Sequence, residues 1–266
     1  MSVRLPTREV EKPWGRDSLP PPFAAPDGRR IGEIWFEPPP PLPQLLVKYI
    51  FTSEALSVQV HPSDAQRPGH GKEECWLIVD AEPGARLGIG FREPIGPEAM
   101  RAAALDGGIE RLMAWHPVRA GDFFYIPANT VHAIGAGISL IEVQQNSDVT
   151  YRLYDYGRPR ELHLEEGVAV AKGEPYAARW RKAVAPDGFA TLVDGPLFRL
   201  HQIDGPYGED VAARYGERPL LVIPRTATVH IGGEAITPSQ CALAPNLYTV
   251  NFDGAGSTLI AQPCLI

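Results

Sequence analysis

The sequence has few cysteines, no long apolar run and no concentration of positive charge. Its three cysteines, Cys75, Cys241 and Cys264, are not in a metal-type spacing, so we expect reduced, packed thiols and no disulfide framework. No stretch approaches 18 apolar residues, and the N-terminal residues lack the apolar core of a signal peptide. These absences argue against a membrane-spanning helix and against secretion, and predict a soluble cytoplasmic protein.

Charge and composition narrow the class of protein further. The formal net charge is −7 and no basic stripe is present, so we expect neither nucleic acid nor an anionic membrane as a partner. The 26 glycines and 28 prolines, together with many short runs of β-branched and aromatic residues, are typical of a turn-rich, mainly β architecture. The 266 residues fit one large β domain or two smaller ones.

Four polar residues that suit a metal ion lie on or beside predicted strands. Gln59 and His61 project to the same side of an extended segment, while the valines flanking Gln59 face the other side. Glu74 opens an apolar strand, and His132 follows a β-prone run and a tight turn. One amide oxygen, one carboxylate and two imidazoles form a ligand set that suits zinc and leaves room for water or substrate.

Two regions of helical character interrupt the β pattern. Helix formers at helical spacing between about residues 97 and 115, broken by Gly107-Gly108, predict two short helices inserted between strands. A further helix is predicted from Glu161 to about Lys172. We predict a metal-binding domain over residues 1–172, a linker over 173–188, and a second, metal-free β-sandwich or small barrel over 189–266.

Several motifs follow one another in order through roughly residues 10 to 170. They are Trp14-Gly15, Gly32-Glu33 with Trp35, Leu46-Val47-Lys48, Leu56-Ser57-Val58-Gln59-Val60-His61-Pro62-Ser63-Asp64, Gly71-Lys72-Glu73-Glu74-Cys75-Trp76, Gly121-Asp122, Ile126-Pro127-Ala128-Asn129-Thr130-Val131-His132-Ala133, the segment from Glu142 to Asp155, and Arg160-Glu161-Leu162-His163. With these motifs the chain resembles the type I phosphomannose isomerases. These are zinc enzymes of the cupin superfamily that interconvert mannose 6-phosphate and fructose 6-phosphate.

The resemblance carries expectations for the fold and for the site. It implies cupin-type jelly-roll barrels and one Zn²⁺ per chain. The metal ligands implied by the family are the four residues reached above from strand geometry, Gln59, His61, Glu74 and His132. It also implies catalytic roles for Arg152 and Lys72, and a sugar-phosphate pocket lined in addition by Ser57, Lys48 and Asp148.

The chemistry of such an isomerase requires a proton carrier that the sequence leaves open. Moving a carbonyl between C1 and C2 of a sugar phosphate removes a carbon-bound proton and leaves an enediolate, whose negative charge needs stabilisation. Lys72 is one candidate for the carrier, and a metal-bound hydroxide or the carboxylate of Glu142 is another. The planar guanidinium of Arg152 suits a phosphate or the enediolate, because it donates two parallel hydrogen bonds.

Two other functions compete with the isomerase. The first is another metal-dependent cupin enzyme, acting on glucose 6-phosphate or as a dioxygenase, since one fold supports several chemistries. The amide ligand Gln59 lies outside the usual two-histidine, one-carboxylate set of iron dioxygenases. The second is a sugar-phosphate-binding protein without turnover, against which the intact ligands, Lys72 and Arg152 argue.

Overall fold

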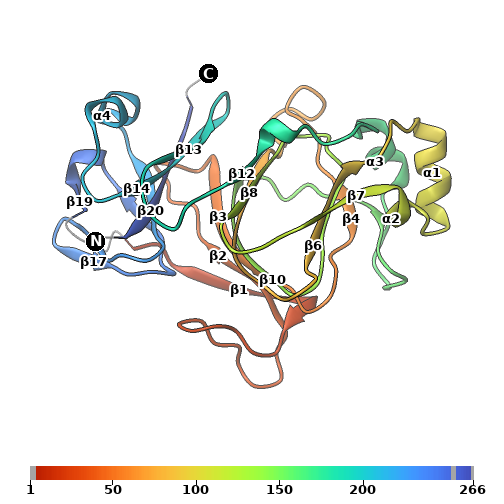
Figure 1. The fold of residues 1–266 in the computed structure, drawn as a ribbon, viewed down its shortest axis with the longest axis horizontal. Coiled ribbons are helices and arrows are strands. Elements are labelled where there is room, and N and C mark those ends of the chain that lie inside the picture. The colour runs from red at the N-terminus through yellow and green to blue at the C-terminus, as the bar shows by residue number, and fades with distance from the viewer. Residues whose placement is uncertain (1–3, 253–255, 265–266) are drawn as a thin grey trace.

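The computed structural model describes residues 4–252 and 256–264. The chain is mainly β, with four sheets and four short α-helices in the described residues. Two facing sheets and three of the helices occupy one half of the molecule, and the C-terminal sheets and the fourth helix occupy the other (Figure 1). The prediction of a mainly β fold is confirmed.

The largest sheet has seven antiparallel strands. In spatial order they are β1 (Thr7–Arg16), β2 (Ile31–Phe36), β3 (Leu45–Phe51), β10 (Ile138–Gln145), β5 (Glu74–Ala81), β8 (Asp122–Ile126) and β12 (Arg181–Ala183). The apolar strand predicted to open at Glu74 is β5, and its side chains alternate: Trp76 and Ile78 join one hydrophobic cluster, while Cys75 and Leu77 join another on the opposite face. The central strands of the sheet are therefore buried on both faces, whereas the edge strands β1 and β12 are largely exposed.

A five-stranded sheet faces it and closes the barrel. Its strands in spatial order are β11 (Tyr151–Tyr154), β4 (Val58–Val60), β9 (His132–Ile134), β6 (Arg86–Phe91) and β7 (Met113–Pro117). The cluster that fills the space between the sheets combines Trp76 and Phe124 of the larger sheet with Leu87 and Ile89 of the smaller one. This packing fixes the two sheets relative to each other, and with them the polar residues at their strand ends.

The helical insertion is confirmed. Helices α1 (Pro97–Leu105) and α2 (Ile109–Leu112) flank the predicted break, and the predicted third helix is α3 (Leu164–Val170). It is shorter than predicted at both ends. The chain is held to β11 before the helix starts, because the His163 amide donates to the Arg152 carbonyl, and Lys172 is already extended where its amide donates to Asn129.

The C-terminal half builds two further sheets and helix α4 (Glu209–Tyr215). One has the order β13 (Ala190–Asp194), β14 (Phe198–Asp204), β20 (Ser257–Pro263), β15 (Leu220–Pro224), β18 (Ala242–Ala244); the other has β17 (Glu234–Ile236), β16 (Val229–Ile231), β19 (Val250–Asn251). Strand β12 falls within the predicted linker and pairs with β8, and one hydrophobic cluster contains residues of both halves. The division into domains remains a prediction.

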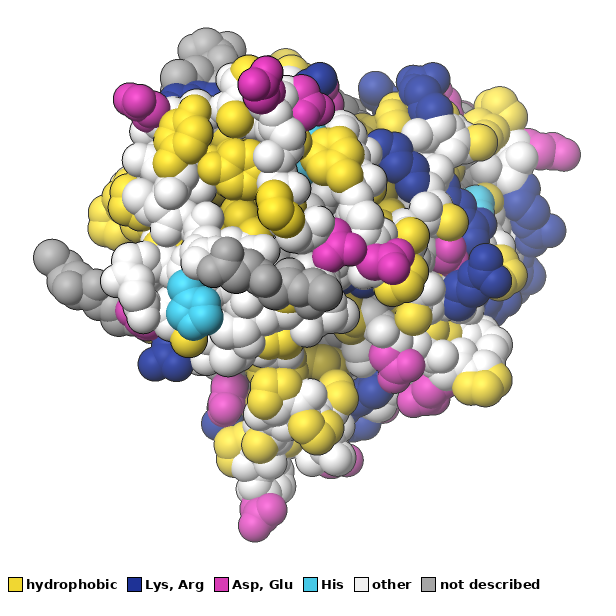
Figure 2. All heavy atoms as spheres, turned by 60° about the vertical axis from the view of Figure 1, so that its left-hand side comes forward, with side chains coloured by type: hydrophobic (Ala, Val, Ile, Leu, Met, Phe, Trp, Pro, Cys, Tyr) yellow, Lys and Arg dark blue, Asp and Glu magenta, His cyan; other side chains and the backbone are white. Residues whose placement is uncertain are grey.

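Three further features concern the surface of the C-terminal half, the cysteines and the length of the helices. Figure 2 shows the face of the C-terminal half, where acidic and apolar side chains are mixed and most basic ones gather toward the right-hand edge. All three cysteines are free, as predicted. Within residues 4–252 and 256–264, no helix combines the length and apolar character needed to cross a membrane.

Candidate active site

The four predicted ligands meet between the two facing sheets. Gln59 lies on β4, directly opposite His132, the first residue of β9. His61 follows β4, and Glu74 is the first residue of β5 in the opposite sheet. His61, Glu74 and His132 are buried, and their potential ligand atoms all lie within 4.8 Å of one another. Strand pairing therefore brings together residues that are up to 73 positions apart in sequence.

The distances between these donor atoms fit one small cation. The Nε2 atoms of His61 and His132 lie 3.5 and 3.4 Å from the two carboxylate oxygens of Glu74. A tetrahedral zinc site with ligand distances of about 2.1 Å separates its donor atoms by roughly 3.4 Å. Neither Glu74 oxygen accepts a hydrogen bond of normal geometry, although Lys72 Nζ lies 2.8 Å from Oε2. A buried carboxylate with unused lone pairs is the group that a metal ion satisfies.

Backbone carbonyls orient both imidazoles toward this point. Nδ1 of His61 lies 2.8 Å from the Val149 carbonyl oxygen, and Nδ1 of His132 lies 2.9 Å from that of Thr130. A carbonyl oxygen only accepts, so each Nδ1 carries the proton and each Nε2 keeps a free lone pair. In metal-binding histidines, a hydrogen bond from the ring nitrogen that does not bind the metal fixes the ring orientation and the tautomer.

The protonation states also suit coordination. Burial, followed by the positive charge of Lys72, lowers the pKa of His61 well below its usual value, and burial lowers the pKa of His132 despite the nearby Glu74 carboxylate. Burial acts to raise the pKa of Glu74, but the positive charge of Lys72 is the largest opposing effect and the pKa is lowered. The site thus holds neutral imidazoles and an ionised carboxylate, the forms that bind metals.

The amide of Gln59 can complete the ligand set. Its Nε2 lies 3.2 Å from His132 Nε2, and its Oε1 accepts a hydrogen bond from Ser57 Oγ at 3.0 Å. The two orientations of a side-chain amide have nearly the same shape, so a half turn places Oε1 toward the imidazole. Ser57 can support either orientation, because a hydroxyl both donates and accepts.

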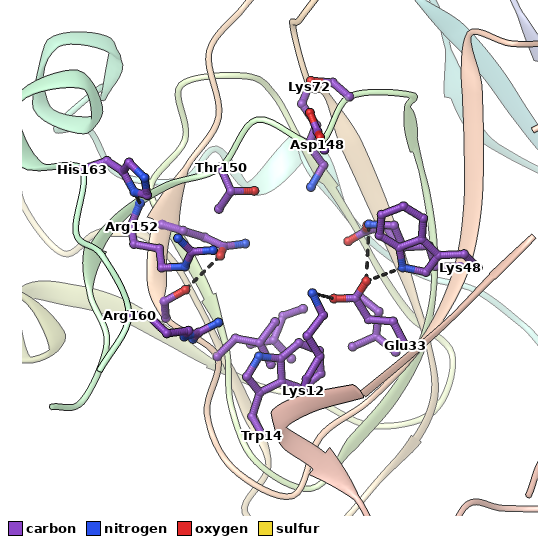
Figure 3. A pocket seen from close by; sticks show the side chains of 18 residues that line it. Lys12, Trp14, Glu33, Lys48, Lys72, Asp148, Thr150, Arg152, Arg160 and His163 are labelled. Atoms are coloured by element: carbon purple, nitrogen blue, oxygen red, sulfur yellow. Dashed lines mark hydrogen bonds and ion pairs between the residues drawn. The ribbon is translucent and has the colours of Figure 1, made fainter. Parts of the chain in front are cut away.

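A charged cavity of about 370 Å³ lies beside the ligand cluster, because Gln59 and Lys72, which contacts His61 and Glu74, both line it. Five basic side chains line it, together with three acidic ones: Lys12, Lys48, Lys72, Arg152, Arg160, Glu33, Glu142 and Asp148. Figure 3 shows Lys12, Glu33 and Lys48 on one side, Arg152, Arg160 and His163 on the other, and Lys72 with Asp148 at a third. An excess of positive side chains around a concave site favours an anionic ligand.

All five predicted pocket residues besides the metal ligands line this cavity. Lys72 Nζ lies 3.1 Å from His61 Nε2, beside the ligand cluster. Arg152 pairs with Gln59 across β11 and β4 and, among the described side chains, its guanidinium has no hydrogen bond or ion pair. Asp148 is exposed, and no ion pair joins it to Arg152.

The sequence did not single out the ion pairs that hold the cavity walls. Lys48 Nζ donates to Glu142 Oε1 at 3.0 Å, and Trp76 Nε1 donates to the other carboxylate oxygen at 2.9 Å. On the opposite wall, Asp155 accepts two hydrogen bonds from Arg160, both at 2.6 Å. The motif segments contained these residues, but nothing in the spacing of Lys48 and Glu142, 94 positions apart, indicates their contact.

Comparison with known proteins places this site in context. Over 228 residues the chain is 36% identical to the mannose-6-phosphate isomerase of Streptococcus mutans, which covers 79% of this chain and 71% of the relative. It is 43% identical over 137 residues to mannose-6-phosphate isomerase ManA of Bacillus subtilis, covering 47% of this chain and 43% of that protein. No protein-family model matches the sequence.

Solved structures share the fold over nearly the whole chain. The mannose 6-phosphate isomerase from Bacillus subtilis superposes with a TM-score of 0.79 at 22% identity, covering 98% of this chain and 99% of that one. A putative mannosephosphate isomerase from Archaeoglobus fulgidus gives a TM-score of 0.73 at 18% identity and covers 100% and 99%. The predicted fold class, a cupin-type jelly roll with a small helical insertion, is confirmed.

Proposed function

The chain belongs to the mannose-6-phosphate isomerase family, and we propose that it interconverts mannose 6-phosphate and fructose 6-phosphate with one Zn²⁺ per chain. One observation carries the proposal. A buried set of two imidazoles and a carboxylate, with donor atoms within 4.8 Å, lies next to a cavity that Gln59, Lys72 and four further basic side chains line. A zinc site beside an anion-binding cavity suits a reaction of a sugar phosphate in which negative charge develops on oxygen.

In this proposal Gln59, His61, Glu74 and His132 hold the zinc ion. The donor separations near 3.4 Å and the unsatisfied oxygens of Glu74 support the assignment. When bound, zinc supplies Lewis-acid stabilisation of the oxygen atoms at C1 and C2.

We assign the transfer of the carbon-bound proton to Lys72. Its Nζ lies within 3.1 Å of two proposed ligands, His61 and Glu74, and its side chain lines the cavity, so it lies beside the position at which a zinc ion would hold the reacting end of the sugar. Of the two other candidates, a metal-bound hydroxide and Glu142, the carboxylate has both oxygens engaged by Lys48 and Trp76. That carboxylate therefore serves to hold Lys48 at the cavity wall.

We assign to Arg152 the stabilisation of the negative charge that develops on the enediolate. Its strand register opposite Gln59 places it on the metal side of the cavity, and no carboxylate of the described residues forms an ion pair with its guanidinium. A free planar fork can donate two parallel hydrogen bonds to the reacting oxygens. Ser57, Lys48 and Asp148, which also line the cavity, are assigned to binding the hydroxyl and phosphate groups of the substrate.

The test is a coupled assay that detects fructose 6-phosphate. Zinc-loaded protein should form it from mannose 6-phosphate, lose this activity on chelation, and regain it when zinc is restored. Glucose 6-phosphate in a parallel reaction separates the two hexose phosphates. Failure of the zinc-loaded protein to turn over mannose 6-phosphate, with binding retained, would instead favour a sugar-phosphate-binding protein.

Two wider predictions accompany this activity. A sugar phosphate is the expected small-molecule partner, and the cytoplasm and carbohydrate metabolism are the expected setting. Both stay predictions, supported by the family membership of the chain.

A further inference from the structure

We propose that Lys12 is a substrate-recognition residue that binds the phosphate end of the sugar phosphate, and that Glu33 positions it. This inference rests on the isomerase function proposed above, in which Lys12 and Glu33 have no assigned role. Lys12 lies on β1, at the edge of the seven-stranded sheet, and its side chain lines the cavity.

A glycine on the neighbouring strand gives Lys12 its path into the cavity. A Cβ atom added at Gly32 would lie 2.6 Å from Cβ and Cγ of Lys12 and 2.7 Å from the ring of Trp14. Real Cβ atoms do not approach other atoms this closely, so the absence of a side chain at position 32 lets the lysine stem and the indole lie across β2. The Gly32-Glu33 pair noted in the sequence thus has a packing reason.

Glu33 holds the ammonium group at the inner end of this path. Its Oε1 lies 3.1 Å from Lys12 Nζ, its Oε2 accepts a hydrogen bond from Trp35 Nε1, and Lys48 Nζ lies 3.9 Å away. The Glu33 side chain is only 8% exposed, whereas that of Lys12 is 28% exposed. An ammonium has three donors, so Lys12 keeps donors for a ligand after pairing with Glu33.

The strand order places Lys12 at the end of the cavity away from the metal ligands. Four strand spacings, roughly 19 Å measured along the curved sheet, separate β1 from β5, on which Glu74 lies. Figure 3 shows Lys12 pointing into the cavity from the side opposite Lys72, which contacts Glu74. Arg152 lies at the metal end, opposite Gln59.

This arrangement matches the two ends of the substrate. A hexose 6-phosphate reacts at C1 and C2 and carries its dianion at C6, so a molecule with its reacting carbons at the metal directs its phosphate toward the far end. A lysine acts there as a point charge that satisfies a phosphate without demanding a fixed geometry. Lys12, on β1, is therefore placed to bind the phosphate at the end of the cavity away from the metal ligands.

The test compares Lys12→Met with Lys12→Arg in the zinc-loaded protein. Lys12→Met should raise KM for mannose 6-phosphate on the order of tenfold and leave kcat within about twofold, because the lost contact is equally present in the ground and transition states. Lys12→Arg should recover most of the loss. Glu33→Gln should raise KM in the same direction, since a neutral amide oxygen holds the ammonium less strongly than the carboxylate does.

A matched control lies on the same strand. Arg8 also pairs with a glutamate and packs over Trp35, but it does not line the cavity, so Arg8→Met should leave KM unchanged. An unchanged KM in Lys12→Met, or a fall in kcat alone, would overturn the role of Lys12 while the isomerase function stands.

Binding of inorganic phosphate, measured by calorimetry, separates this inference from the isomerase proposal because it needs no turnover. If the wild-type protein fails to isomerise, a weaker phosphate affinity in Lys12→Met still supports Lys12 as an anion-binding residue. An unchanged affinity overturns it.

Discussion

At the scale of single residues, Glu74 is the centre of the site. It faces both histidines, contacts Lys72 and is almost completely buried. Its neighbour Glu73 is on the opposite face of the strand start, where the Tyr125 hydroxyl donates to it. Adjacent carboxylates therefore have separate environments, because side chains alternate along a strand.

We expect Glu74→Gln to lower zinc affinity by about a hundredfold or more. Loss of a direct ligand should cost at least as much affinity as loss of a residue that only hydrogen-bonds to a ligand. The measurement is metal content by mass spectrometry after dialysis against a weak chelator. Glu73→Gln is the matched control and should keep the metal. Equal zinc content in the two variants would remove Glu74 from the ligand set.

For Arg152 we expect a loss of turnover without a loss of metal. Arg152→Lys should lower kcat on the order of 10²- to 10³-fold, because a lysine cannot make the paired hydrogen bonds of a guanidinium to a developing charge. The coupled assay and the zinc content are measured on the same sample. Arg101→Lys, at an exposed helix position, is the control, and wild-type kcat in Arg152→Lys would contradict the assignment.

At the scale of elements, the turn before β9 aligns the ligand-bearing segments. Asn129 has a left-handed backbone with φ of 73°, which asparagine tolerates better than most residues. Its amide donates to the His61 carbonyl at 2.8 Å, its side chain donates to Gln66 at 2.6 Å, and its carbonyl accepts from Lys172. This one turn ties three segments together around the site.

The strain at this turn can be measured with two substitutions. Asn129→Gly keeps the left-handed conformation accessible, whereas Asn129→Ala does not. We expect the alanine variant to have a free energy of unfolding about 1 kcal/mol below that of the glycine variant, measured in urea. Equal stabilities would show that the backbone conformation at residue 129 is not the limiting feature.

At the scale of the whole molecule, stability depends on a histidine far from the metal site. His201 is fully buried, its Nδ1 donates to the Tyr215 hydroxyl oxygen at 2.9 Å, and its Nε2 has no partner. Burial, followed by the positive charge of Arg214, lowers the pKa of His201 from 6.5 to about 4. The neutral imidazole therefore belongs to the folded state.

This lowered pKa makes folding sensitive to acid in a defined window. Between about pH 6.5 and 4 the unfolded chain binds a proton at His201 that the folded chain does not, so the free energy of unfolding falls as pH falls. In His201→Gln the free energy of unfolding should fall less between pH 7.5 and 5 than in the wild type, by about 1–2 kcal/mol. His230→Gln, at an exposed position, should behave like the wild type, and an identical fall in all three proteins would contradict the assignment.

The sequence by itself determined the local features of this protein. The apolar run after Glu74 predicted strand β5, the turn formers predicted the tight turn before His132, and the Gly107-Gly108 pair predicted the break between two helices. Each depends on neighbours a few positions apart, so propensity and periodicity are sufficient to predict it.

Only the tertiary structure decided how the cavity walls are built. Lys12 meets Glu33, and Lys48 meets Glu142, through the register of neighbouring strands, which places residues up to 94 positions apart side by side. Register and sheet closure depend on packing over the whole barrel, since a shift of one residue would turn every side chain to the other face. The donor set could thus be predicted from its residue types, whereas the distances that suit a cation come from the way the two sheets face each other.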